Sequence, residues 1–123
     1  MRVAFMFSKL NPIYRQIGEH IKSVLASGEL GPGARIPSVR ELAGSFGVNP
    51  NTVQRALKEL ETGGLLFTKR TVGRYVTADK SVLEKLRNDI RAQTAKKFID
   101  DMGALGVTGR SLDAYMKNYS AGE

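Results

Sequence analysis

The residues Ser38–Thr62, SVRELAGSFGVNPNTVQRALKELET, carry two short apolar periodicities on either side of Gly47. Apolar residues recur every three or four positions in each half, which predicts two amphipathic helices joined by a tight turn. Ser38 and Glu41 form a capping-box pattern before the first helix, and Asn49 is a capping residue followed by proline before the second. Two helices in this arrangement are typical of a helix-turn-helix, in which the second helix lies in the major groove of DNA.

A further helix is predicted upstream of this pair. Asn11 can cap it, Pro12 suits its first position, and Gly28 can end it. Its apolar stripe, at spacings of three and four, consists of Ile13, Ile17, Ile21, Val24 and Leu25. Before this helix, alternating side chains suggest a short extended arm on the core, formed by Val3, Phe5 and Phe7.

A β-hairpin is predicted downstream of the pair. Residues 65–68 and 75–77 read LLFT and YVT, and they flank the basic turn KRTVGR at residues 69–74. Two short apolar segments around a turn that contains glycine are typical of a hairpin. Three helices followed by such a hairpin make a winged helix-turn-helix, so the expected fold class is mainly α with a small β-hairpin.

Residues 79–123 change character and predict a two-helix segment. A long helix is expected to be interrupted at Thr94 and broken by Gly103 and Gly106, and Thr108 or Ser111 can cap the last helix. Two such helices cannot bury both apolar faces alone, so they need either the first domain or a second copy of the chain. The residues expected between two copies are Leu83, Leu86, Ile90, Phe98, Met102, Leu112, Tyr115, Met116 and Tyr119.

From this pattern we expect two parts: a winged helix-turn-helix DNA-binding domain at residues 1–78 and a short helical dimerisation segment at residues 79–123. The charge distribution agrees with this division. The net charge is +7, and residues 1–80 carry 12 Lys and Arg against 6 Asp and Glu, whereas residues 81–123 carry 7 against 6. A basic excess in the first two-thirds favours a polyanionic partner such as nucleic acid.

Composition also limits where the protein is expected to act. The chain has no cysteine, no apolar run long enough to span a bilayer and no signal-peptide pattern. We therefore expect a cytoplasmic protein without membrane contact.

Together these segments resemble the GntR family of transcription regulators, and the short tail is similar to that of the YtrA-like subfamily. The similarity covers residues 12–76 and is carried by the strings PGARIPSVRELA, VNPNTVQRALKEL and KRTVGRYV. It implies a homodimeric repressor that binds double-stranded DNA at a near-palindromic operator. Two departures are visible: Pro50 stands where better-known relatives place a base-reading arginine, and the wing lacks the common Gly-x-Gly.

The resemblance also implies which residues contact DNA. Arg40 matches the DNA-contacting arginine of the second helix, and Gly73 matches the wing glycine that lets the backbone approach the minor groove. The start and outer face of the recognition helix correspond to Asn49, Asn51, Thr52, Gln54 and Arg55.

The side chains themselves support these assignments. Asn51 and Gln54 can pair with adenine and Arg55 with guanine, each giving about 1–3 kcal/mol of discrimination. In the wing, cations would approach the DNA backbone or the minor groove. The wing residues expected to do so are Lys69, Arg70 and Arg74.

Several of these residues have a structural alternative. Asn49 is first of all a helix cap, and Arg40 could be a solvated surface charge. Gln54 and Arg55 are adjacent on the helix and cannot both point equally into the groove, so one of them can lack a contact with DNA. Tyr115 and Tyr119 suit packing better than a ligand cage.

Four classes of function compete. A sequence-specific DNA-binding repressor fits best, because a sequence-tolerant architectural DNA-binding protein would not need Asn51, Thr52 and Gln54 at the helix start. A protein-interaction module would not need the basic wing. No nucleophile–base pair, phosphate loop or metal cluster is visible, so we expect no enzyme activity, cofactor or metal. The tail of about 45 residues is too short to enclose a large ligand pocket, although a small effector of unknown identity could bind between subunits.

Overall fold

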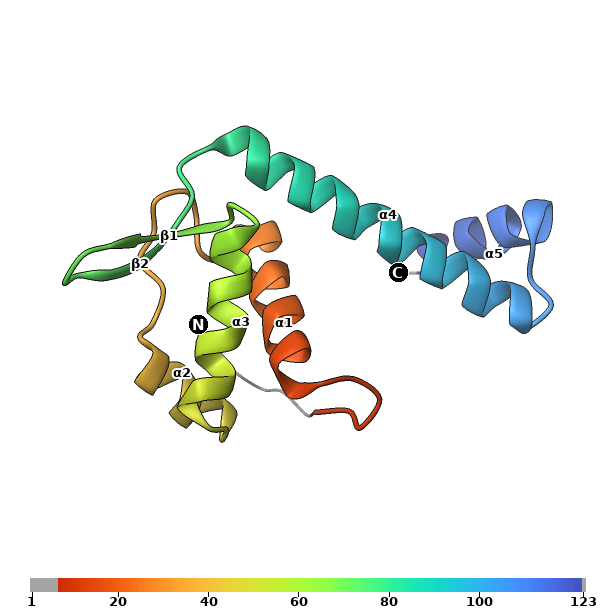
Figure 1. The fold of residues 1–123 in the computed structure, drawn as a ribbon. Coiled ribbons are helices and arrows are strands. Elements are labelled where there is room, and N and C mark those ends of the chain that lie inside the picture. Colours follow the sequence, from red (N-terminus) through yellow and green to blue (C-terminus); the bar gives the residue numbers. More distant parts are fainter. Residues whose placement is uncertain (1–6, 123) are drawn as a thin grey trace. The chain divides into compact units, whose positions relative to one another are not determined.

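The structure is a computed structural model that describes residues 7–122 of the chain. Within them the elements follow the order α1 (Ile13–Ser27), α2 (Val39–Phe46), α3 (Pro50–Thr62), β1 (Leu66–Lys69), β2 (Gly73–Val76), α4 (Lys80–Ala104) and α5 (Gly109–Ala121) (Figure 1). The predicted fold class, mainly helical with one small hairpin, is confirmed. The chain divides into two compact units, one that ends at Arg87 and one that begins at Asn88.

The first unit is built around three helices. Helix α3 packs against both α1 and α2, and Figure 1 shows α1 and α3 side by side. Apolar side chains from these helices, the hairpin and the start of α4 form one continuous core. Its large members are Ile17, Ile21, Leu25, Ile36, Leu42, Phe46, Val53, Leu57, Leu60, Leu65, Leu66, Val76 and Leu83.

Helix α1 begins one residue later than the sequence pattern predicted. No side chain caps it, so the predicted cap at Asn11 is wrong. The Gln16 side chain instead links this end of the helix to the preceding residues. Its amide nitrogen donates to the carbonyl oxygens of Ser8 and Asn11 at 2.7 and 2.8 Å. Its amide oxygen accepts from the Ser8 N–H at 2.8 Å. Ile13 was also misplaced, because it is 43% exposed while the rest of its stripe is buried.

The hairpin is antiparallel, and its register pairs Thr68 with Arg74 and Lys69 with Gly73. Its turn is therefore shorter than the predicted basic tip and consists of residues 70–72, with Thr71 in a left-handed conformation at φ 64°. The loop before α2 runs along the other edge of β2, where the Ile36 N–H donates to the Arg74 carbonyl at 3.0 Å. The hairpin and this loop thus form one connected surface. Within the predicted N-terminal arm, Phe7 packs against Phe46, and Val3 and Phe5 lie outside the described residues.

The start of α4 belongs to the first unit. Leu83 is only 4% exposed in its core, Leu86 packs against that core, and the Arg87 Nε donates to the Ala26 carbonyl oxygen at 2.9 Å. The unit therefore extends past residue 78, where the sequence suggested a boundary. Leu83 is buried within its own chain and offers no surface to a partner, which corrects its assignment to the dimer interface.

The remainder of α4 and α5 form the second unit. Helix α4 continues through Thr94 and Gly103, where interruptions were expected, and ends at Ala104 before Gly106, whose φ is 85°. Thr108 precedes α5 as its capping residue, and its N–H donates to the Ser111 hydroxyl at 3.0 Å.

Candidate nucleic-acid interface

Helix α3 has a buried side and an exposed side. Val53, Ala56, Leu57 and Leu60 are buried in the core, which fixes the helix to its own unit. Asn51 and Gln54 are exposed, and Thr52 is half-buried beside them. Polar side chains at the start of a helix that is anchored on its far side can reach the base edges in a major groove. The exposed side of α3 therefore has the chemistry that a recognition helix needs.

Local signals place the start of this helix as predicted. Gly47 ends α2 in a left-handed conformation at φ 69°, and its N–H donates to the Ala43 carbonyl at 2.9 Å. The Asn49 side chain then accepts from the Asn51 N–H at 2.8 Å, which confirms its role as a cap. This bond uses one acceptor site of the Asn49 side-chain oxygen to hold the start of α3. Arg40 lies exposed on α2.

The two adjacent candidates Gln54 and Arg55 have different surroundings. The guanidinium carbon of Arg55 lies 3.8 Å from the centre of the Tyr14 ring, a cation–π contact with α1. Gln54 instead contacts the wing. Tyr14 was not identified from the sequence, because its partner is 41 positions away in the chain.

A polar network joins the wing to α3. One carboxylate oxygen of Glu61 accepts from the Thr68 hydroxyl and from the Arg74 Nε. Thr68 and Arg74 are cross-strand partners, so a single carboxylate holds both strands of the hairpin. The Arg74 Nη1 also donates to the Gln54 Oε1 at 3.4 Å. The predicted DNA contact Arg74 is thus bound to its own protein, with 17% of its side chain exposed.

The charge state of Glu61 controls this network. Burial alone would raise the pKa of the Glu61 carboxyl, but the hydrogen bonds from Thr68 and Arg74, with the charges of Arg74 and Lys58, lower it below the usual range. The pKa of Glu61 is lower in the folded chain than in the unfolded chain. The network therefore contributes its full stabilisation at pH values above the pKa of an unfolded glutamate, about 4.3. The stabilisation is lost as the pH falls through the folded pKa.

A Glu61→Gln variant should therefore show a pH-dependent loss of stability. We expect it to lower the free energy of unfolding by about 1 kcal/mol at neutral pH, because a charged hydrogen-bond acceptor at a partly exposed site is lost. The difference from the unsubstituted protein should shrink as the pH falls below about 4.3. Urea denaturation across this pH range measures it, with Glu29→Gln in an exposed loop as the control. A difference that does not change with pH would contradict the role assigned to Glu61.

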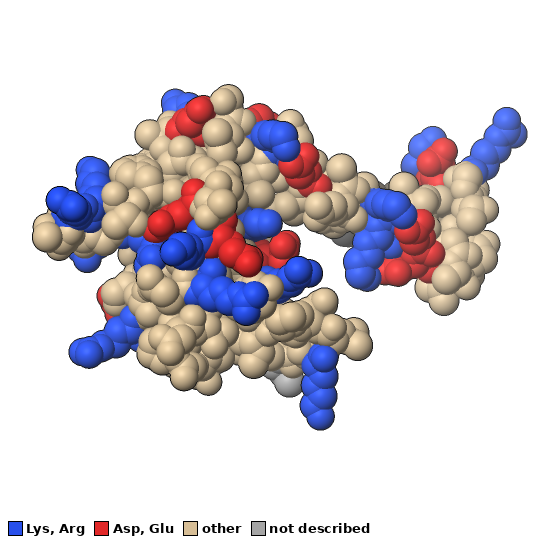
Figure 2. Space-filling model, viewed as in Figure 1, with Lys and Arg blue, Asp and Glu red and all other residues tan. Residues whose placement is uncertain are grey.

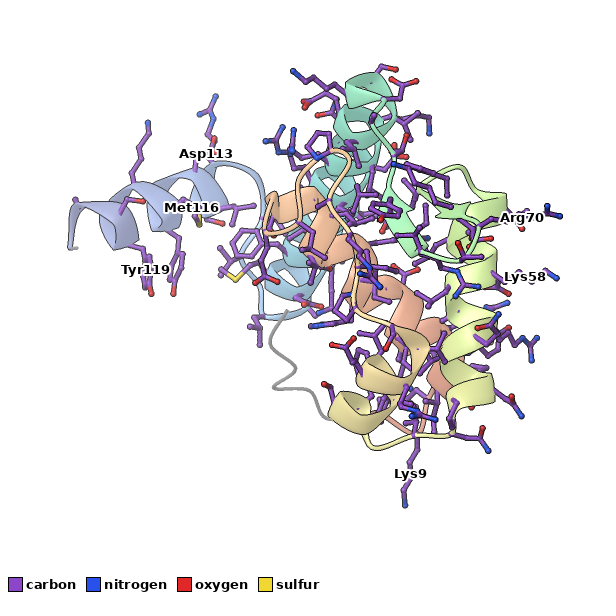
Figure 3. The ribbon with its side chains drawn as sticks, turned by 90° about the vertical axis from the view of Figure 1, so that its left-hand side faces the viewer. Lys9, Lys58, Arg70, Asp113, Met116 and Tyr119 are labelled. Atoms are coloured by element: carbon purple, nitrogen blue, oxygen red, sulfur yellow. The ribbon has the colours of Figure 1, made fainter. Side chains whose placement is uncertain are left out.

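The tip of the wing presents cations to solvent. The Lys69 ammonium lies 4.7 Å from the centre of the Tyr75 ring, and Arg70 is exposed. Figure 3 shows Arg70 and Lys58 extending outward on the same side of the unit, and Figure 2 shows basic side chains over the end of the hairpin. Exposed cations next to the polar side of α3 can bind phosphates.

Arg35, in the loop before α2, lies against the wing, and the sequence did not single it out. The backbone of Arg35 forms an antiparallel bridge with that of Tyr75 at the edge of β2. Its guanidinium lies against Gly73. The base of the wing and the start of α2 border one shallow cavity of about 240 Å³, which Arg35, Ser38 and Arg74 help to line. The only sequence signal was a positive charge in the loop before α2.

Replacing Gly73 by alanine should destabilise the wing. Its φ is 139°, and an added Cβ would stand 3.3 Å from the Arg35 Nε. We expect the Gly73→Ala free energy of unfolding to fall by about 1–3 kcal/mol. The matched control is Gly18→Ala in α1, where a Cβ meets nothing within 4 Å and helix propensity should raise stability by about 0.5–1 kcal/mol. Urea titration should give opposite signs for the two variants; the same sign would refute this account.

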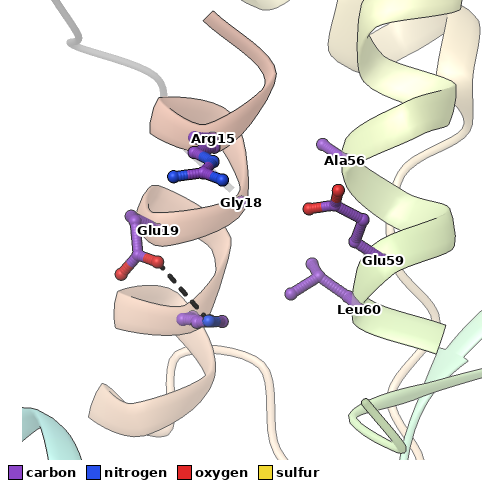
Figure 4. Close-up of a pocket in the computed structure, with 7 residues that line it drawn as sticks. Arg15, Gly18, Glu19, Ala56, Glu59 and Leu60 are labelled. Carbon is purple, nitrogen blue, oxygen red and sulfur yellow. Dashed lines mark hydrogen bonds and ion pairs between the residues drawn. The ribbon is translucent and has the colours of Figure 1, made fainter. Parts of the chain in front are cut away.

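A second hollow on the first unit has a different character. It lies between α1 and α3, has a volume of about 340 Å³, and is lined by Arg15, Glu19, Lys22 and Glu59 around Gly18 and Ala56 (Figure 4). Lys22 pairs with Glu19 at 3.4 Å. Two cations and two carboxylates balance each other, so this groove lacks the excess positive charge of the wing.

The second unit exposes apolar surface. None of residues 88–122 is buried, and Phe98, Tyr115, Met116 and Tyr119 are exposed, as are Ile99 and Leu105, which the predicted interface omitted. Tyr119 is 62% exposed, and its ring stacks on that of Tyr115 with centres 6.3 Å apart. Figure 3 shows Asp113 and Tyr119 on opposite sides of α5, so this helix has a charged and an aromatic side. The other predicted interface residues, Ile90, Met102 and Leu112, are half-buried.

Over residues 7–122, no three acidic or histidine side chains come together as a metal site, and none of the helices there has the length and apolarity to cross a bilayer.

Comparisons with known proteins identify the family. The family model described as "Bacterial regulatory proteins, gntR family" matches residues 13–76. The HTH-type transcriptional repressor YtrA of Bacillus subtilis (strain 168) is 38% identical over 111 residues, which cover 89% of this chain and 85% of YtrA. A GntR family transcriptional regulator from Listeria monocytogenes is 40% identical with a TM-score of 0.81, covering 91% of this chain and 98% of that structure.

A structure of a protein bound to DNA also matches. The AraR(DBD) complex with operator ORX1 is 29% identical with a TM-score of 0.59, covering 63% of this chain and 99% of that one. These similar proteins are transcription regulators and not enzymes. The family match covers more than half of the chain, and YtrA aligns along most of both proteins. The chain therefore belongs to the GntR family of bacterial regulatory proteins.

Proposed function

We propose that the protein is a sequence-specific DNA-binding transcription repressor that acts in the cytoplasm as a homodimer on a near-palindromic operator. The observation that carries this proposal is the exposed polar side of α3, anchored from behind by the core and flanked by a basic wing. Two similarities support it: YtrA is described as a repressor, and the AraR domain was solved with its operator.

In this proposal the candidate residues divide by role. Asn51, Thr52 and Gln54 contact base edges, where each well-placed pair gives about 1–3 kcal/mol of discrimination. Arg40, Lys69 and Arg70 contact phosphates and position the protein without selecting a sequence. Arg55, stacked on Tyr14, joins this second group, while Asn49 and Gly73 shape the backbone that presents the contacts.

The exposed apolar side of the second unit supports the homodimer. Clustered exposed aromatic and aliphatic side chains are typical of a protein–protein contact. A two-fold dimer places two recognition helices about one helical turn of DNA apart, or a multiple of it, and so matches a palindromic operator. We further propose that the DNA-binding part ends near Arg87 and that the residues after it supply the dimer contact.

The alternative is a sequence-tolerant architectural DNA-binding protein, which the basic wing alone would also allow. Fluorescence anisotropy separates the two, with a duplex from upstream of the protein's own gene and a scrambled duplex, each at about 50 and about 200 mM salt. A preference for the upstream duplex that persists at the higher salt supports base recognition. Equal binding that collapses with salt indicates phosphate contacts alone, and would favour the architectural alternative.

A further inference from the structure

The contact between Arg74 and Gln54 limits which atoms of Gln54 are available to DNA. The Arg74 Nη1 lies 3.4 Å from the Gln54 Oε1. A guanidinium has donors and no acceptor, so only the oxygen of the Gln54 amide can face it. The amide NH2 group then points to the other side, away from the wing cation. Gln54 therefore offers donors to a base more readily than its acceptor.

Arg74 is held in this position by two strands and a helix. Its Nε pairs with the carboxylate of Glu61, two helical turns after Gln54 on α3, and the same carboxylate accepts from Thr68. Its cross-strand partner in the hairpin is that same Thr68. These bonds restrain the guanidinium beside Gln54, where it would face an approaching base.

The bases differ in how they suit this arrangement. In the major groove adenine presents the N7 acceptor and the N6 amino donor, and the usual glutamine–adenine pair needs the amide oxygen to accept from N6. Here that oxygen already faces a cation, which would also oppose the adenine amino group. Guanine presents two acceptors, N7 and O6, which suit the amide NH2 and a neighbouring positive charge.

We infer that Gln54 recognises guanine rather than adenine, and that Arg74 is the positioning residue that determines this choice. The inference deepens the proposed function and rests on it, because it names the base read by one residue of the recognition helix. It also replaces the expectation that Gln54 pairs with adenine, and it gives Arg74 a role other than phosphate binding.

Selection from a pool of duplexes with a random centre provides the test. The full-length protein yields a consensus, and each base pair is then varied in anisotropy titrations. The position read by Gln54 is the one at which Gln54→Ala abolishes discrimination. We expect guanine there, with about tenfold weaker binding when adenine replaces it. In Arg74→Ala the preference should fall below about threefold or turn to adenine, and Arg74→Lys, which keeps a cationic donor, should retain guanine.

The control and the contrary outcomes are distinct. Arg70→Ala removes one wing cation without touching Gln54, so it should weaken binding to every duplex by the same factor. If Arg74→Ala does the same and leaves the guanine preference unchanged, Arg74 is only structural and the inference fails. An adenine at the Gln54 position also overturns it, while the proposed function stands. If the selection yields no consensus sequence, both this inference and the proposed sequence-specific function fail.

Discussion

A chain that ends at Arg87 is expected to be monomeric and to bind an operator with two half-sites at least about 100-fold more weakly than the full chain. The shortened chain keeps the whole core of the first unit, including Leu83, and the bond from Arg87 to the Ala26 carbonyl. It loses the exposed apolar side chains of the second unit. Sedimentation equilibrium measures the mass, and anisotropy measures the affinity.

The size of this effect follows from linkage of the two sites. In a dimer, once one half-site is bound, the second binding event is intramolecular, which raises the overall affinity by about 100- to 10,000-fold. A duplex with a single half-site removes this advantage, so both chains should bind it with equal affinity. If the shortened chain stays dimeric at micromolar concentration, the dimer contact lies in the first unit.

A pair of point variants tests whether the proposed dimer contact lies on α5. Tyr119→Asp places a charge among the exposed aromatic side chains and should dissociate the dimer. Asp113→Ala changes the opposite side of the same helix and should leave the dimer intact. Similar dissociation by both variants would mean that helix stability, and not the aromatic side, controls assembly.

The parts of the fold that the sequence predicted well depend on neighbouring residues. The Ser38 hydroxyl accepts from the Glu41 N–H at 3.1 Å, and the Glu41 carboxylate accepts from the Ser38 N–H at 3.4 Å, as the capping-box pattern indicated. The Gly47 turn and the Asn49 cap were predictable for the same reason. Each is completed within four residues, so the pattern contains both partners.

The parts that were missed depend on distant partners. Arg74 carries a charge in the sequence, but only the hairpin register and the end of α3 show that Glu61 binds it. Leu83 was assigned to a dimer because its periodicity continues along α4, whereas its burial depends on the core of the first unit. Gly103 did not break α4, since glycine inside a helix costs only about 1 kcal/mol and packing can offset this.

Replacing Leu57 by alanine is expected to lower the free energy of unfolding by about 3 kcal/mol, within a usual range of about 2–5. Leu57 is 1% exposed and lies in the core on α3, so its loss leaves a cavity under this helix. For a unit of this size the melting temperature should fall by about 4–8 °C per kcal/mol. Differential scanning calorimetry measures the shift, and Lys58→Ala on the exposed side should change stability by less than about 0.5 kcal/mol.

Comparing this variant with Gln54→Ala distinguishes residues of α3 that stabilise the fold from residues proposed to contact DNA. Leu57 cannot touch DNA, so Leu57→Ala should lose operator affinity only as it unfolds and should regain it at lower temperature. Gln54→Ala should melt near the temperature of the unsubstituted protein yet lose base discrimination at every temperature. If Leu57→Ala bound weakly while fully folded, the cavity would have moved α3 itself. Operator binding would then depend on the core packing beneath α3 as well as on the exposed side chains of that helix.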